Sequence, residues 1–160
     1  MFRKAIFLLL LVLFALPAIA EPASRISLEL PNLKGEMVSL NNYLGKNTII
    51  LSFFASWSKS CQEEVLFLND LNDKYSKKGI KVIGISFDKT LDQLKTFITQ
   101  NQIGFEVLYD KKLKTLKDFR ILIIPTLLVI DLEGNIKNTY VDFDKNVEEA
   151  VSKALRALES

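Results

Sequence analysis

The sequence contains no histidine and only one cysteine, Cys61, among its 160 residues. Histidine is the commonest general base and the commonest metal ligand in proteins, so its absence argues against zinc and copper sites and against Ser–His catalysis. A single cysteine cannot form a disulfide within one chain. We therefore predict no bound metal and no cofactor, and any redox chemistry of this protein would depend on Cys61.

The sequence also lacks an apolar run of the length that a membrane-spanning helix requires. The apolar stretch Ala5–Leu16 has 12 residues, whereas a helix needs roughly 20 to cross a bilayer. Arg3 and Lys4 precede this stretch, and the small residues Ala18 and Ala20 follow it, which is typical of an export signal that is cleaved after Ala20. The alternative is that the stretch is kept as an anchor.

We predict that residues 1–20 are a signal peptide and that residues 21–160 form one exported domain. This domain would be periplasmic or otherwise outside the cytoplasm, with no stable membrane span after cleavage. Of the 21 basic residues of the chain, Arg3 and Lys4 leave with the signal, so the domain has 19 basic residues against 19 acidic ones. It therefore has no net positive charge with which to attract nucleic acid.

The apolar pattern predicts an α/β fold. Continuous apolar runs indicate strands that are buried on both faces, and apolar residues at helical spacing indicate amphipathic helices. Strands that alternate with helices and end in an antiparallel hairpin imply a mixed central sheet flanked by helices. The expected elements are an N-terminal β-hairpin over 26–40, strands over 48–56 and 80–88, helices over 65–75 and 91–98, a short strand over 105–108, a short helix ending at 119, a hairpin over 124–143 and a helix over 147–158.

Cys61 lies where the buried strand over 48–56 is expected to give way to a helix. Open α/β sheets build functional sites at the carboxyl ends of such strands. Ser58 or Ser60 would cap the helix, and either cap places the Cys61 sulfur in the first helical turn, where the positive end of the helix favours a thiolate. Lys59 would strengthen this effect.

Two acidic residues oppose the effect of the helix end. Glu63 and Glu64 would raise the pKa of a nearby thiol, and the sequence leaves the sign of the sum open. The second interpretation is that Cys61 is a small buried hydrophobic residue and that Glu63 and Glu64 are ordinary acids of the first helical turn. Trp57 likewise has two interpretations, as a core residue or as an aromatic wall of a site.

Pro125 is the other informative residue of the sequence. It stands at the start of an apolar strand, where proline is tolerated only at a first residue or at an edge. Such a proline is in some proteins cis, and a cis proline shapes a tight, exposed segment of backbone. The pattern therefore marks a second segment that could belong to a site.

Taken together, these features resemble the exported thiol-disulfide oxidoreductases of the TlpA/ResA type, within the redoxin (AhpC/TSA-like) superfamily. The resemblance covers about Ile26 to Leu158 and rests on LPNLKGEMVSLNNYLGKNTIILSFFASWSKSCQEE, followed in the family's order by VIGISFD, IIPTLLVID and EGNI. It implies a thioredoxin-like domain over residues 21–160 and a role in cell redox homeostasis. It also implies that Pro125 is the family's cis-proline, Trp57 its site tryptophan and Glu64 its first-helix glutamate.

The sequence departs from this family at the chemistry. The family pattern is Trp-Cys-x-x-Cys, and here Ser58 replaces the attacking cysteine while Cys61 matches the resolving one. Leu66 also stands where the family usually has proline. A serine hydroxyl without a histidine to activate it cannot replace a thiolate nucleophile. The usual dithiol–disulfide cycle is therefore excluded within one chain.

Three functions follow from this departure. The first is a single-cysteine oxidoreductase, in which Cys61 forms mixed disulfides with an exported thiol-containing protein or a small thiol. Ile124 and Pro125 would dock the partner's extended chain as a short strand, and Ser58 would cap the helix and donate a hydrogen bond to the sulfur. A dimer linked through Cys61 of two copies is a further expectation of this hypothesis.

The second function is a non-enzymatic binding module, which keeps the thioredoxin groove but has lost the chemistry. The third is a thiol peroxidase, because peroxiredoxins share the fold and resemble this chain in the turn Ser58-x-x-Cys61, where the cysteine becomes a sulfenic acid. The peroxiredoxin proline, however, would fall on Phe54, and Pro125 fits the thioredoxins.

Overall fold

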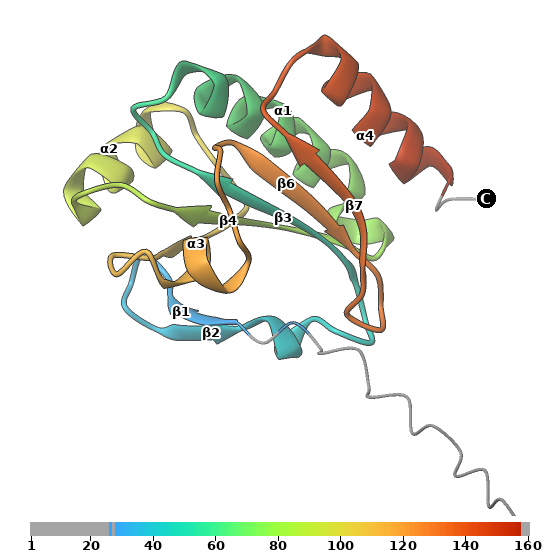
Figure 1. The fold of residues 1–160 in the computed structure, drawn as a ribbon, viewed down its shortest axis with the longest axis horizontal. Helices are drawn as coiled ribbons and strands as arrows, with labels where there is room; N and C mark the ends of the chain where they lie inside the picture. The colour runs from blue at the N-terminus through green and yellow to red at the C-terminus, as the bar shows by residue number, and fades with distance from the viewer. Residues whose placement is uncertain (1–25, 27, 158–160) are drawn as a thin grey trace, which may run out of the picture.

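A sheet of five strands lies at the centre of the protein, with a separate two-stranded hairpin beside it (Figure 1). The computed structural model describes residue 26 and residues 28–157. The elements are β1 (Glu29–Pro31), β2 (Met37–Ser39), η1 (Leu40–Asn42), β3 (Thr48–Phe54), α1 (Lys59–Tyr75), η2 (Ser76–Lys78), β4 (Ile80–Ser86), α2 (Leu91–Gln100), β5 (Glu106–Tyr109), α3 (Lys114–Asp118), β6 (Thr126–Ile130), β7 (Ile136–Val141) and α4 (Lys145–Ala157). The predicted signal peptide lies outside the described residues.

The strand order in the sheet is β5-β4-β3-β6-β7. β4 is parallel to both β3 and β5, whereas β6 is antiparallel to both β3 and β7. This arrangement confirms the predicted α/β fold with a mixed sheet. The N-terminal hairpin is confirmed as well, with β1 and β2 paired antiparallel over three residues each.

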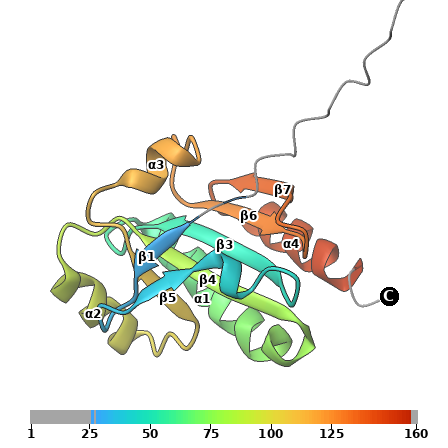
Figure 2. The same ribbon diagram turned by 90° about the horizontal axis from the view of Figure 1, so that it is seen from below.

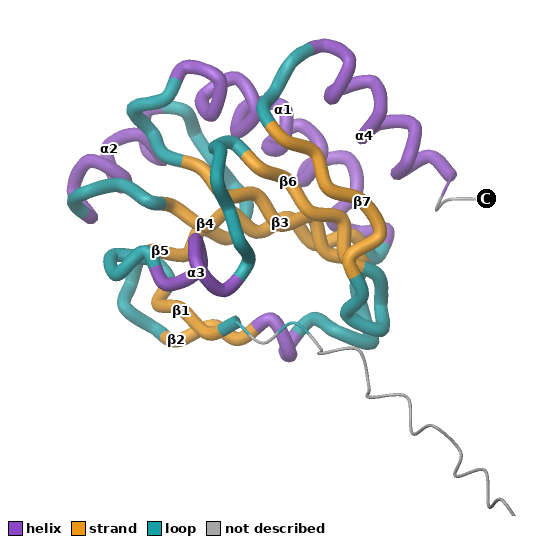
Figure 3. The backbone as a smooth tube through the Cα atoms, viewed as in Figure 1, coloured by secondary structure: helices purple, strands orange, loops and turns teal. Residues whose placement is uncertain are grey.

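Both faces of the sheet are covered, as Figures 2 and 3 show. One hydrophobic cluster joins the sheet to α1, α2 and α4, and the other joins it to the β1–β2 hairpin and the α3 segment. Along β3, Ile50 and Phe54 belong to the first cluster, and Ile49, Leu51 and Phe53 to the second. Successive side chains of a strand point to opposite faces. The continuous apolar run of this strand therefore reflects burial on both sides, as predicted.

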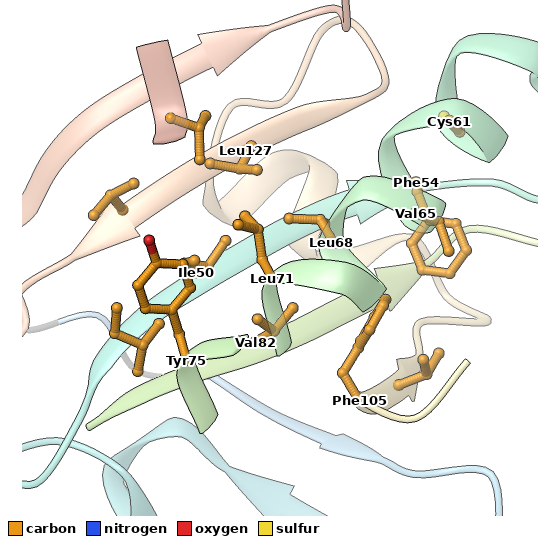
Figure 4. Packing of buried hydrophobic residues seen from close by; sticks show 14 of the residues in the cluster. Ile50, Phe54, Cys61, Val65, Leu68, Leu71, Tyr75, Val82, Phe105 and Leu127 are labelled. Carbon is orange, nitrogen blue, oxygen red and sulfur yellow. The ribbon is translucent and has the colours of Figure 1, made fainter. Parts of the chain in front are cut away.

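The first cluster is the larger core of the protein. Figure 4 shows Leu68 and Leu71 of α1 packed towards Ile50 and Val82 of the sheet, and Val65 beside Phe54. Helix α1 ends at Tyr75, and the chain then passes through η2 to a residue with φ 79°, Gly79. A left-handed residue is the common end of a helix, and glycine adopts it without strain. No helix in the described part of the chain is long and apolar enough to cross a membrane.

Gly84→Ala is expected to lower the free energy of unfolding by about 1–3 kcal/mol, because overpacking a well-filled core forces neighbours to shift. A Cβ at Gly84 would lie 2.9 Å from Cε1 of Phe54 and 3.0 Å from Cε2 of Phe105. Urea denaturation measures the change. Gly104→Ala is the matched control, since its Cβ would lie 3.7 Å from the nearest atom, Oδ1 of Asn69. Equal losses in the two variants would show that the two phenylalanine rings do not limit the space at Gly84.

Candidate functional site

Helix α1 begins directly after the turn that follows β3, and Ser58 is its cap. The Ser58 Oγ accepts a hydrogen bond of 3.4 Å from the backbone N–H of Cys61, and the Ser58 carbonyl accepts one of 3.0 Å from Gln62. Ser58, and not Ser60, is therefore the N-cap of α1, and Cys61 is the third residue of the helix. Ser60 has another partner, because its Oγ donates to Oδ1 of Asp142 at 2.6 Å.

Cys61 is completely buried. Its exposed fraction is 0 %, and its side chain belongs to the core cluster that also contains Phe54 and Val65 (Figure 4). Burial raises the pKa of the Cys61 thiol above its ordinary value, although hydrogen bonds from Ser58 and from the Ala55 backbone oppose the shift. The sequence left open whether the pKa of Cys61 is raised or lowered. Burial decides that it is raised, and the thiol is therefore protonated at neutral pH.

Glu64 is buried one turn further along α1. Its exposed fraction is 0 %, and its Oε2 accepts a hydrogen bond of 2.5 Å from the Ser52 hydroxyl on β3. Its Oε1 has no hydrogen-bond partner among the described residues. Burial raises the pKa of Glu64 to about 8, so this carboxyl group is neutral at pH 7.

The interpretation of the two glutamates as ordinary acids of the first turn is wrong. The first turn of α1 contains no acidic residue. Glu63 is exposed and its Oε1 lies 3.9 Å from Nζ of Lys59, the other residue expected to modulate the site. Glu64, in contrast, faces the core, where a neutral acid avoids the large cost of burying a charge. The sequence alone could not separate these neighbours, because their difference is one of burial.

Asp88 holds the turn before α1 in place. It was not identified as a site residue from the sequence. Its side chain is 2 % exposed. Its carboxylate accepts hydrogen bonds from the Ser56 N–H at 3.2 Å, from the Ser56 hydroxyl at 2.6 Å and from the Ser86 hydroxyl at 2.7 Å. This residue therefore fixes the backbone beside Trp57. The only signal for it in the sequence is a carboxylate directly after a buried strand.

Trp57 is exposed, with 66 % of its surface accessible, so it is not a core residue. It lines a cavity of about 490 Å³ together with Gln62 from α1, Asp88, and Phe97 from α2. This places the ring at the mouth of a hollow between the two helices. Of the two interpretations from the sequence, the aromatic wall fits this position.

The Ile124–Pro125 peptide bond is cis. Phe53 at the end of β3 is paired with Thr126 at the start of β6, so the cis-proline lies beside the turn that leads to α1. Asp142 links the two segments, because its backbone N–H donates to the Pro125 carbonyl at 2.8 Å while its carboxylate accepts from Ser60.

A thioredoxin-like fold is thus combined with the site expected of its redox members, apart from the missing nucleophile. A strand-to-helix turn with an exposed tryptophan faces a cis-proline, and the resolving-position cysteine lies in the first helical turn. Among residues 26 and 28–157, no group of three or more acidic or cysteine side chains is placed to hold a metal ion. The fold and the arrangement of this site therefore define a thioredoxin-like protein.

Comparison with known sequences gives the family. A sequence profile described as the AhpC/TSA family matches residues 19–139, and the chain belongs to that family. The chain is 31 % identical over 121 residues to the thiol-disulfide oxidoreductase ResA of Bacillus thuringiensis subsp. konkukian, covering 72 % of this chain and 69 % of ResA. It is 30 % identical over 115 residues to the thioredoxin-like protein YneN of Bacillus subtilis, covering 70 % and 66 %.

Solved structures agree with the thioredoxin-like fold. A Chlorobium tepidum protein described as a thiol:disulfide interchange protein DsbE superposes with a TM-score of 0.78 at 27 % identity, over 83 % of this chain and 93 % of that protein. A thiol-disulfide oxidoreductase from Bacteroides fragilis gives a TM-score of 0.73 at 27 % identity, over 84 % and 98 %. The resemblance to ResA-type proteins is confirmed.

Glu64 is expected to make the stability of the protein fall as the pH rises. Its pKa is about 8 in the folded protein against 4.5 for a free glutamate. The unfolded chain therefore releases this proton first, and the free energy of unfolding falls between about pH 4.5 and pH 8, by roughly 1.4 kcal/mol per pKa unit. Urea denaturation at several pH values should show a smaller decrease for Glu64→Gln. Glu63→Gln, the exposed control, should keep the wild-type slope, and a wild-type slope in Glu64→Gln would contradict the prediction.

Cys61 is expected to react with iodoacetamide at pH 7 about 100-fold more slowly than a free cysteine, because it is buried and protonated. In urea its rate should become that of a free cysteine. Mass spectrometry follows both reactions. The matched control is the double variant Ser58→Cys, Cys61→Ser, which moves the single thiol to the partly exposed position 58. Equal rates in the wild type and this variant at pH 7 would show that burial does not protect Cys61.

Proposed function

We propose that this protein is an exported binding module of the thioredoxin fold, which docks an extended segment of a partner protein beside its cis-proline. The observation that carries the proposal is the state of Cys61. The only thiol of the chain has no accessible surface and a raised pKa, and Ser58 occupies the position of the attacking cysteine. The turn before α1 and the cis-proline are therefore kept, but the attacking cysteine is not.

The backbone beside Pro125 supports docking of an extended chain. The N–H and C=O groups of Ile124 make no hydrogen bond with any other described residue. Unpaired backbone groups next to a sheet accept an added strand, whose backbone provides affinity while its side chains provide specificity. Trp57, exposed in the turn after the strand that pairs with β6, offers an aromatic surface of the kind that anchors many protein interfaces. The partner would then contribute an extended segment with an apolar side chain.

Export of the protein is part of the proposal. The apolar stretch Ala5–Leu16, with basic residues before it and Ala18 and Ala20 after it, supports a cleaved signal. The partner is accordingly an exported protein. A small thiol remains the alternative partner if Cys61 reacts.

A single-cysteine oxidoreductase is the second candidate. Hydrogen bonds from Ser58 and the Ala55 backbone lower the pKa of Cys61 against the effect of burial, and relatives such as ResA are named thiol-disulfide oxidoreductases. In this reaction the Cys61 thiolate attacks a partner disulfide, forms a mixed disulfide and releases the other partner sulfur as a thiolate. A thiol from a third molecule must then release Cys61. The reaction requires an opening of the core that surrounds the sulfur.

The peroxidase hypothesis has less support from the geometry. A peroxidatic cysteine must be a thiolate that peroxide can reach. Cys61 is buried, and its thiol is protonated at neutral pH. We therefore do not favour this function.

Selection of random, unstructured peptides on the immobilised domain tests the proposal. A selected peptide should bind Cys61→Ala within twofold of the wild type, and Trp57→Ala about tenfold more weakly, since the buried indole surface is lost. Fluorescence anisotropy measures both affinities. Leu66→Ala, a change of an exposed apolar residue on α1, is the control and should bind as the wild type does.

Two results would contradict the proposal that the protein binds its partner without a reaction at Cys61. Loss of binding in Cys61→Ala, together with a disulfide-linked adduct of a cysteine-containing peptide, would establish the oxidoreductase instead. Unchanged binding in Trp57→Ala would show that the peptide lies elsewhere on the protein.

A further inference from the structure

A strongly basic segment lies on the face of the sheet opposite α1. Residues 111–120 contain five basic residues against one acidic residue, whereas the rest of residues 21–160 contains 14 basic and 18 acidic ones. All five basic side chains are exposed. They are Lys111, Lys112, Lys114, Lys117 and Arg120. A domain without net charge therefore has a concentration of positive charge in this segment.

Exposed apolar side chains accompany these basic residues. Leu122 is 94 % exposed and Ile123 is 55 % exposed, and both line a cavity of about 280 Å³ with Val141 of β7. Leu113, between the lysines, is 44 % exposed. We call residues 111–123 the basic–apolar segment. Figure 2 shows α3, its helical part, projecting from the body of the protein.

The fold holds the basic–apolar segment in this orientation. Ile121 is 8 % exposed and belongs to the second core cluster, against which Leu116 and Phe119 pack. The buried carboxylate of Asp110 accepts hydrogen bonds of 2.7 Å from both the N–H and the hydroxyl of Thr115. Because Ile121 and Thr115 anchor the segment to the core, Leu122 and the basic side chains stay exposed to solvent.

The N-terminal end of the described chain meets the same face. Ile26 packs against the second core cluster, which also holds Ile121. Five residues separate Ile26 from the predicted cleavage point after Ala20, and a chain of this length spans at most roughly 20 Å. Before cleavage, the domain is therefore joined to its export signal on the face that carries the basic–apolar segment.

We propose that the basic–apolar segment docks on the surface of an anionic lipid bilayer. The lysines and Arg120 bind the lipid phosphates, while Leu122 and Ile123 enter the boundary between headgroups and acyl chains. Basic residues are attracted by an anionic membrane surface, and apolar side chains beside them add burial in the interface. An acidic protein would satisfy the basic residues but would leave unexplained why a nearly fully exposed leucine is held among them.

This docking has a consequence for the groove. Ile123 is separated from Pro125 by a single residue, so a segment bound to lipid holds the cis-proline close to the bilayer. Ile123 adjoins Ile124, which the proposed function uses, but vesicle binding and peptide binding are measured separately, so either proposal can fail without the other. If both hold, the partner is a chain that lies near the membrane.

Flotation of residues 21–160, which contain the complete described core, with phospholipid vesicles tests the proposal. We expect binding to vesicles of phosphatidylglycerol and phosphatidylcholine, no binding to phosphatidylcholine alone, and release at high salt. Reversing two charges with Lys112→Glu and Lys117→Glu should weaken binding about 25-fold or more, at about fivefold per basic residue lost. Leu122→Ser should weaken it about tenfold, through lost apolar burial.

Matched variants on other faces are the controls. Lys145→Glu with Lys153→Glu changes the net charge equally on α4, and Leu66→Ser removes an exposed leucine from α1. Both should bind vesicles nearly as the wild type does. Equal weakening in the α4 variant, binding that ignores lipid charge, or absence of binding would overturn the proposal. Binding of polyglutamate through the same lysines without vesicle binding would also overturn it, in favour of an acidic protein partner.

Discussion

The position of β3 between a parallel and an antiparallel neighbour is the constraint on which the rest of the structure depends. Its side chains fill both hydrophobic clusters, with Ile50 and Phe54 on one side and Leu51 and Phe53 on the other. A slip of one residue would move every one of these side chains to the wrong face. The pairing of Phe53 with Thr126 is therefore strongly specified. It brings the turn before α1 next to the cis-proline, and the site exists because these two segments meet.

Two aspartates then hold the chain around the start of α1, one before the helix and one in its first turn. Asp88, after β4, binds the backbone and hydroxyl of Ser56, and Asp142, after β7, joins Ser60 to the Pro125 carbonyl. Asp142 has φ 66°, a left-handed conformation that aspartate tolerates better than most residues. These hydrogen bonds keep the geometry of a redox site although its attacking thiol is absent. The frame of the groove is thus independent of the chemistry that usually goes with it.

Burial outweighs the other electrostatic effects in this site. A helix end typically favours a nearby charge by only about 0.3–1 kcal/mol, whereas Cys61 and Glu64 have lost all contact with water. Both groups are consequently neutral at pH 7. The Ser52 hydroxyl partly compensates Glu64, and Ser58 partly compensates Cys61. A buried, protonated thiol is a poor nucleophile, because the thiolate is the reactive form.

The sequence by itself determined the elements of this protein, because apolar periodicity, helix caps and glycine ends are local. It placed the strands that fill the core and Pro125 at the start of β6, and it limited the cap before Cys61 to Ser58 or Ser60. Only the tertiary structure decided the protonation of Cys61 and Glu64, since burial depends on segments that are distant in the chain. The roles of Asp88 and Asp142 were equally hidden, because their serine partners lie 32 and 82 residues away. Local patterns specify which elements form, and only their packing specifies which side chains lose water and which ones meet.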